Sequence, residues 1–139
     1  SVLLTWGPGE EEMVRNIADS MKQQSWIAPA TTIAESIGLY KKLSLFVGSD
    51  SGPFHICWAL GVPTVSVWGP TDPNRNGAYS KNHGAVFHKL NCSFCWKRQC
   101  PLGTTECMDK ITVQNVFEAT KTLASEHVKM VISSQRSTH

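Results

Sequence analysis

The chain has 139 residues, a length that suits one domain of ordinary size. Hydrophobic residues make up 41% of it and charged residues 17%, which excludes the disordered class, and its apolar runs are too short to span a membrane. The formal net charge is only +2 and the basic residues are spread along the chain, so no nucleic-acid partner is expected.

Apolar runs and helix-period segments alternate along the chain, separated by Gly or Pro turns. The helix predicted over 10–23 has its apolar residues at i, i+3, i+4 and i+7. The next helix begins at Thr32, which forms a capping-box pattern with Glu35. Pro53 suits the first position of the third helix, and Gly61 suits its C-terminal cap. The predicted strands span 2–6, 26–28, 45–48, 64–68 and 85–88, and the predicted helices span 10–23, 32–42, 53–60 and 112–126.

Strands that are nearly all apolar and alternate with helices indicate a parallel sheet covered on both faces. The predicted class is therefore α/β, with a doubly wound, mainly parallel, Rossmann-like sheet. The chain opens directly inside a strand and holds only four or five strands, which predicts a domain without its first strand–helix unit. We expect this domain to span 1–132, followed by a polar, flexible tail over 133–139.

Three loops that each follow a strand carry the strongest physical signal in the chain. They are Gly7–Glu10, Asp50–His55 and Gly69–Pro73. In open α/β sheets, ligands bind beyond the carboxyl ends of the strands. We therefore expect all three loops to lie along one ligand-binding rim of the sheet.

The middle loop is the most informative of the three. A helix N-terminus has free N–H groups and a partial positive charge, which together form an anion site. Gly52 leaves room for a phosphate, Ser51 adds a hydroxyl donor, and His55 lies in the first turn of the helix. The alternative is purely structural: Asp50 or Ser51 caps the helix, and His55 is an ordinary surface residue.

The stretch from Gly48 to Pro73, GSDSGPFHICWALGVPTVSVWGPTDP, resembles the signature of glycosyltransferase family 9, the ADP-heptose:lipopolysaccharide heptosyltransferases. The segment Leu4–Glu12 resembles the preceding nucleotide-binding loop of that family. The cysteine-rich segment 92–108 resembles that of heptosyltransferase II-like members. The likeness covers about residues 2–125.

The resemblance implies a donor diphosphate at the middle loop. Ser51 and Gly52 would offer hydroxyl and N–H donors to the diphosphate. His55 would approach a phosphate, and Asp50 would fix the loop and touch the sugar.

The resemblance also assigns residues outside the middle loop to the donor. Glu10 would accept hydrogen bonds from the ribose hydroxyls. The backbone near Thr31 would meet the adenine edge, and Thr71 and Asp72 would border the cleft.

The family pattern further implies an inverting transfer of heptose from ADP-heptose to a lipopolysaccharide-core acceptor. Its members have two Rossmann-like domains in the GT-B arrangement, and the N-terminal domain binds the acceptor and supplies the catalytic base. We find nothing in this chain that matches that domain, so we expect no catalytic residue here. We expect the chain alone to bind the donor weakly at best and to transfer nothing. The scheme requires no metal or other cofactor. Peripheral association with the inner membrane is conceivable for the intact enzyme.

Four of the five cysteines form a cluster that opens with a CxxC pair. Such a cluster suits either a structural zinc site or free thiols, and its second half lacks the CxxC of zinc ribbons. No signal-peptide pattern opens the chain, so we expect a cytoplasmic protein in which disulfides do not form. We expect the cluster to lie away from the phosphate rim, and Cys57 to be a small buried apolar residue. The cluster consists of Cys92, Cys95, Cys100 and Cys107.

Two further hypotheses stay open on the sequence. The chain would also suit the C-terminal half of another GT-B protein, such as a sugar-nucleotide epimerase. A third hypothesis is a small zinc-stabilised interaction module without a nucleotide site.

Overall fold

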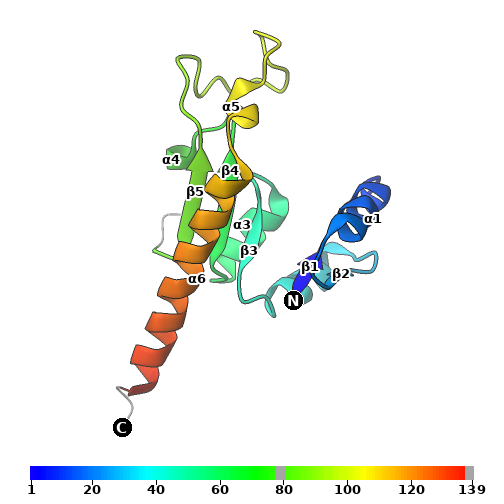
Figure 1. Cartoon of the computed structure of the whole chain (residues 1–139), viewed down its shortest axis with the longest axis vertical. Coiled ribbons are helices and arrows are strands. Elements are labelled where there is room, and N and C mark those ends of the chain that lie inside the picture. The colour runs from blue at the N-terminus through cyan, green and yellow to red at the C-terminus, as the bar shows by residue number, and fades with distance from the viewer. Residues whose placement is uncertain (78–80, 137–139) are drawn as a thin grey trace. The chain divides into compact units, whose positions relative to one another are not determined.

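The computed structural model describes residues 1–77 and 81–136 and shows an α/β chain in which the paired strands of each sheet run parallel (Figure 1). Its internal contacts divide the chain into two compact units, Ser1–Gly38 and Leu39–His139. The predicted α/β class with a parallel sheet is confirmed, but the strands form a two-stranded and a three-stranded sheet. Across the described residues, every helix is too short or too polar to cross a membrane.

The first unit is built on the parallel pair of β1 and β2, in which Leu4 lies opposite Ile27. Val14 and Ala28 are its buried apolar residues. The indole N–H of Trp6 donates to the carbonyl of Ala28 over 2.7 Å, which ties the loop after β1 to the end of β2. The elements are β1 (Val2–Leu4), α1 (Glu11–Ser20), β2 (Ser25–Ile27) and the start of α2 (Ile33–Tyr40).

The capping box predicted at the start of α2 is present. The backbone N–H of Thr32 donates to Glu35 Oε2 over 2.7 Å, and the backbone N–H of Glu35 donates to Thr32 Oγ1 over 3.3 Å. The Thr32 N–H and hydroxyl lower the pKa of the Glu35 carboxyl because both donate to its charged form. Sequence and structure therefore agree on this helix start, although α2 ends at Tyr40 rather than at residue 42.

The second unit is a three-stranded parallel sheet in the order β3-β4-β5. Helix α3 connects β3 to β4, and the short helix α4 follows β4. The elements are β3 (Phe46–Ser49), α3 (Gly52–Ala59), β4 (Thr64–Trp68), α4 (Pro73–Asn76), β5 (His83–Phe87), α5 (Glu106–Asp109) and α6 (Val113–Arg136).

Helices α3 and α6 cover opposite faces of this sheet. Phe54 of α3 packs edge-on against Trp68, with ring centroids 5.5 Å apart. On the other face, a Cβ placed at Gly84 would contact Val65 of β4 and Ala119 of α6. Because successive side chains of a strand point to opposite faces, Val65 and Trp68 of β4 face different helices. The expected double winding is thus present in the second unit.

The core of the second unit lies between α3 and the sheet. Phe54, Cys57 and Trp68 are all completely buried there. The indole N–H of Trp68 donates to Ser66 Oγ over 2.5 Å, and Ser66 Oγ is 2.7 Å from His83 Nε2. This chain of hydrogen bonds satisfies polar groups on the buried face of β4 and β5. It also orders the side chains against which α3 packs.

Helix α3 ends in a Schellman motif. Gly61 has φ of +75°, its N–H donates to Trp58 O over 2.9 Å, and the N–H of Val62 donates to Cys57 O over 3.0 Å. The C-terminal cap predicted at Gly61 is confirmed. The turn also delivers Val62 into the core, where it packs with Cys57.

The last helix is longer than its sequence pattern predicted. We expected an end near Glu126, but α6 continues to Arg136 and so includes part of the segment expected to be a flexible tail. No Gly or Pro interrupts the chain between Val113 and Arg136, so nothing local stops the helix. Residues 137–139 of that expected tail lie outside the described residues.

Candidate functional site

The turn between β3 and α3 holds four of the predicted site residues, Asp50, Ser51, Gly52 and His55. Strand β3 ends at Ser49, and Ser51 is the N-cap residue of α3 with extended backbone angles. Asp50 Oδ1 lies 3.0 Å from His55 Nε2. The Asp50 side chain is only 16% exposed, whereas His55 is 45% exposed. The bond therefore links the two ends of the turn, with the Asp50 carboxylate largely buried and part of the His55 imidazole exposed to solvent.

No side chain caps the N-terminus of α3. The Ser51 hydroxyl donates backwards, to the carbonyl of Ser49 over 3.2 Å. The helix begins its backbone bonding with the N–H of His55, which donates to Ser51 O over 3.2 Å. The earlier N–H groups of Gly52 and Phe54 belong to the helical turn that has no intrahelical acceptor. Of the purely structural alternative, the side-chain cap is therefore not observed, whereas the surface position of His55 is.

The space in front of this helix end is open. A Cβ added at Gly52 would meet no other atom within 4 Å. Two residues further on, Phe54 is completely buried against Trp68 and His83. The first turn of α3 is thus fixed to the core by Phe54, while its backbone at Gly52 is accessible to a ligand. Sequence reasoning did not single out the Phe54 N–H as a donor, although its place in the first helical turn was the available signal.

The loop after β4 holds Thr71 and Asp72. Strands β3 and β4 are parallel neighbours, so their following loops emerge at the same edge of the sheet. Asp72 is the N-cap of α4, and its Oδ1 accepts from the backbone N–H of Asn74 over 2.9 Å. Asp72 therefore shapes its own loop, and both Thr71 and Asp72 are half-buried.

Glu10 and Thr31 belong to the first unit. Glu10 follows β1, and its Oε2 accepts from the backbone N–H of Gly7 over 2.8 Å. Thr31 follows β2, and its hydroxyl lies 2.8 Å from that of Ser36. Since β1 and β2 are parallel, both residues lie at the carboxyl edge of their own sheet. The structure thus groups Glu10 with Thr31 in one unit and the other six predicted residues in the second.

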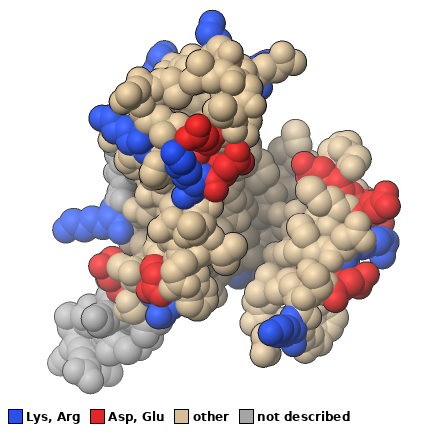
Figure 2. Space-filling view, turned by 45° about the horizontal axis from the view of Figure 1, so that its top comes forward, with Lys and Arg blue, Asp and Glu red and all other residues tan. Residues whose placement is uncertain are grey.

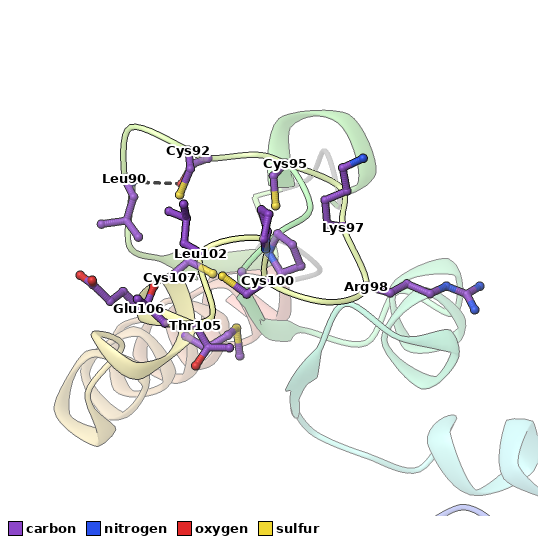
Figure 3. Close-up of a pocket in the computed structure, with 16 residues that line it drawn as sticks. Leu90, Cys92, Cys95, Lys97, Arg98, Cys100, Leu102, Thr105, Glu106 and Cys107 are labelled. Atoms are coloured by element: carbon purple, nitrogen blue, oxygen red, sulfur yellow. Dashed lines mark hydrogen bonds between the residues drawn. The ribbon is translucent and has the colours of Figure 1, made fainter.

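The four clustered cysteines line one cavity of about 220 Å³ (Figure 3). All of them are free thiols, and within 1–77 and 81–136 no three Cys, His, Asp or Glu side chains form a group able to hold a metal ion. Gly69 and Pro70 of the loop after β4 line the same cavity. The expectation that the cluster lies away from the predicted rim is therefore wrong, because the cysteine-rich segment folds back onto that loop.

Cys57 lies apart from the cluster, in the core under α3. It is completely buried, as the sequence predicted. Burial raises the pKa of its thiol to about 11, because the interior disfavours the thiolate.

The charged side chains show no dominant sign on the face drawn in Figure 2. Lys and Arg side chains stand singly there, several of them beside Asp or Glu. The closest of these pairs are within helices, such as Arg15 with Glu11 at 2.6 Å. Exposed pairs of this kind stabilise a helix only slightly.

The sequence profile of glycosyltransferase family 9 (heptosyltransferase) matches residues 1–106. Among curated proteins, lipooligosaccharide heptosyltransferase 2 of Campylobacter jejuni (serotype O:6) is 28% identical over 124 residues. That match covers 86% of this chain and 39% of the relative, so the chain spans about two fifths of the relative's length.

The solved structures that are similar to the chain include a glycosyltransferase of family 9 and a heptosyltransferase. The glycosyl transferase family 9 structure from Veillonella parvula has a TM-score of 0.74 at 23% identity, over 89% of this chain and 36% of that one. It shares the fold. Escherichia coli heptosyltransferase WaaC with ADP has a TM-score of 0.54 at 28% identity, over 60% of this chain and 26% of that one.

Proposed function

This chain belongs to glycosyltransferase family 9, the heptosyltransferases, and we propose that it forms the part of such an enzyme that binds the nucleotide-sugar donor. The proposed donor is ADP-heptose, and the proposed acceptor is the lipopolysaccharide core. The similarity to a heptosyltransferase structure that contains ADP supports adenosine as the nucleoside.

One observation carries the proposal: the N-terminus of α3 is uncapped and opens onto free space at Gly52. The unpaired N–H groups of the first turn and the positive end of the helix dipole favour an anion at this position. A diphosphate supplies that anion. The open space at Gly52 admits its oxygens close to the backbone.

In this scheme the site residues act on different parts of the donor. The N–H groups of Gly52 and Phe54 donate to the diphosphate. The Ser51 hydroxyl, which donates to Ser49 O in this structure, turns to donate to the diphosphate when the donor binds. The exposed His55 ring, oriented by Asp50, approaches a phosphate oxygen. The Asp50–His55 bond limits the freedom of the ring before the donor arrives, which reduces the entropy lost on binding.

The remaining assignments come from the family resemblance alone. Glu10 takes the ribose hydroxyls, and the backbone near Thr31 takes the adenine edge. Thr71 and Asp72 border the sugar side of the diphosphate site.

The proposed reaction is an inverting transfer. A base outside this chain takes the proton of an acceptor hydroxyl, whose oxygen attacks the anomeric carbon of the heptose. The new C–O bond forms as the bond from that carbon to the diphosphate oxygen breaks, and ADP leaves with the bonding electrons. The N–H groups at α3 stabilise the charge that develops on the leaving diphosphate, so protein donors take the place of a cation. We propose a cytoplasmic enzyme.

Thermal unfolding of the 139-residue chain with ADP, UDP and GDP tests the proposal. A ligand that binds only the folded state raises the melting temperature, and the panel separates an ADP-sugar enzyme from an epimerase that uses another nucleotide. We expect the largest shift with ADP.

The decisive variant is Ser51→Asp, which places a negative charge at the proposed anion site. We expect it to weaken ADP binding roughly tenfold or more, equivalent to about 1.4 kcal/mol. Ser125→Asp makes the same charge change on the exposed surface of α6 and should leave ADP binding unchanged. Equal ADP affinity in Ser51→Asp and the unmodified chain would show that the diphosphate binds elsewhere.

A further inference from the structure

The cysteine-rich segment 92–108, which lies between β5 and α6, folds back onto the loop after β4. The backbone N–H of Trp96 donates to the carbonyl of Pro70 over 2.9 Å. Met108 covers Gly69 so closely that a Cβ there would collide with Met108 Sδ and lie 2.9 Å from its Cγ. Gly69 itself is buried, although Met108 is 40% exposed. Met108 therefore forms a cover over the start of this loop.

A third contact involves a residue that follows the loop in the chain. The guanidinium of Arg75, in α4, stands 4.8 Å from the centroid of the Trp96 ring. Gly69 and Pro70 precede the candidate donor residues Thr71 and Asp72, and Arg75 follows them. The cysteine-rich segment thus contacts the loop on both sides of those two residues.

The cavity beside these contacts brings the two ends of the cysteine-rich segment together with the loop. The four thiols line it together with Gly69 and Pro70, and Figure 3 shows sulfur atoms from both ends of the segment turned toward a shared space. The backbone N–H groups of Thr105, Leu102 and Thr104 also lower the pKa of the Cys100 thiol, because they favour its thiolate. Cys107, the neighbour of Met108, lies so that a Cβ at Gly69 would be 3.5 Å from its sulfur. The thiol-lined cavity and the cover over Gly69 are therefore one packed unit.

We propose that the cysteine-rich segment is a brace that positions the loop Gly69–Asp72 for the donor, with Met108 and Trp96 as its positioning residues. The proposal rests on the proposed function for the identity of the ligand. The contacts of the brace with the loop are independent of that function.

Hydrogen exchange of the 139-residue chain, followed residue by residue by NMR, tests the brace without any ligand. In Met108→Ala, we expect the Trp96 amide to exchange about tenfold faster, because its bond to Pro70 O opens more often. Met108→Leu should restore the slow exchange, since leucine fills a similar volume. Met13→Ala is the matched control: Met13 is 54% exposed in the other unit, and its loss should leave the Trp96 amide unchanged.

ADP titration of the same samples tests positioning for the donor. We expect Met108→Ala to weaken ADP binding about threefold to tenfold, the size of one lost hydrogen-bonding interaction. Arg75→Gln should act in the same direction from outside the segment, so the test survives if Met108→Ala unfolds the segment. A cycle with Gly69→Ala should be non-additive with Met108→Ala, because the two sites touch.

The outcomes separate the two proposals. Unchanged exchange at Trp96 together with unchanged ADP affinity in Met108→Ala and Arg75→Gln overturns the brace. Faster exchange in a chain that binds no nucleotide overturns the donor site and keeps the brace.

Discussion

Two cysteines of the same segment differ in how readily their thiols ionise. Backbone N–H groups, that of Thr105 foremost, lower the pKa of Cys100, because they stabilise its thiolate. Burial, with a smaller contribution from the neighbouring Cys100, raises the pKa of Cys107. The difference comes from the backbone N–H groups of residues 102–105, which favour the Cys100 thiolate, and from the burial of Cys107.

This difference predicts the order in which the native chain is alkylated. Only thiolates react with iodoacetamide, so as the pH rises from acid, Cys100 should be labelled before Cys107. Cys57 should be labelled last, because its pKa is about 11 and its side chain is completely buried. Mass mapping of peptides after short exposures at increasing pH measures the order. Labelling of Cys107 ahead of Cys100 would contradict the lowered pKa of Cys100 and the raised pKa of Cys107.

The helices give a pair of glycines on which the same substitution has opposite signs. Gly61 ends α3 with φ of +75°, a conformation that costs an L-residue about 1–2 kcal/mol. Gly38 lies inside α2 with ordinary backbone angles and no atom within 4 Å of an added Cβ. We expect Gly61→Ala to destabilise the fold by about 1 kcal/mol or more, and Gly38→Ala to stabilise it by roughly 0.5–1 kcal/mol. Urea unfolding of both variants measures the signs, and a stabilising Gly61→Ala would rule out the Schellman ending.

Elements with local signals were predictable from the sequence. Strand β4 was predicted with its observed bounds, and the capping box of Thr32 and Glu35 formed as its spacing indicated. Short-range chemistry determines both. The end of α6 was not predictable in the same way, because a helix without Gly or Pro stops where its packing stops, and the polar residues after Glu126 gave no such information.

At the scale of the whole molecule, the α/β class and the position of the Asp50–His55 turn followed from the alternation of strands and helices. The contacts that join distant parts of the chain did not. Met108 over Gly69 and Trp96 on Pro70 pair residues from separate segments, and such contacts leave no periodic pattern in the sequence. For that reason the cysteine-rich segment was expected to lie apart from the loop that it covers.

The share of the relatives that this chain covers leads to a prediction about activity. The chain spans about two fifths of the length of the Campylobacter heptosyltransferase that it matches. We expect binding and transfer to separate: the 139-residue chain should bind ADP without transferring heptose, since the acceptor hydroxyl needs a base that we expect in the remaining part of the enzyme. A radiolabelled-donor assay beside the ADP titration measures both, and robust transfer by this chain would refute the expectation.

The first turn of α3 also determines which mutations the protein can accumulate. Position 52 faces free space, while position 54 is enclosed by aromatic rings on the inner side of the same turn. A randomised library selected only for solubility should therefore accept many residue types at 52 and almost none but phenylalanine at 54. Selection for ADP binding would add a restriction at 52 alone, so comparing the two selections separates the demands of ligand binding from those of folding within three consecutive codons.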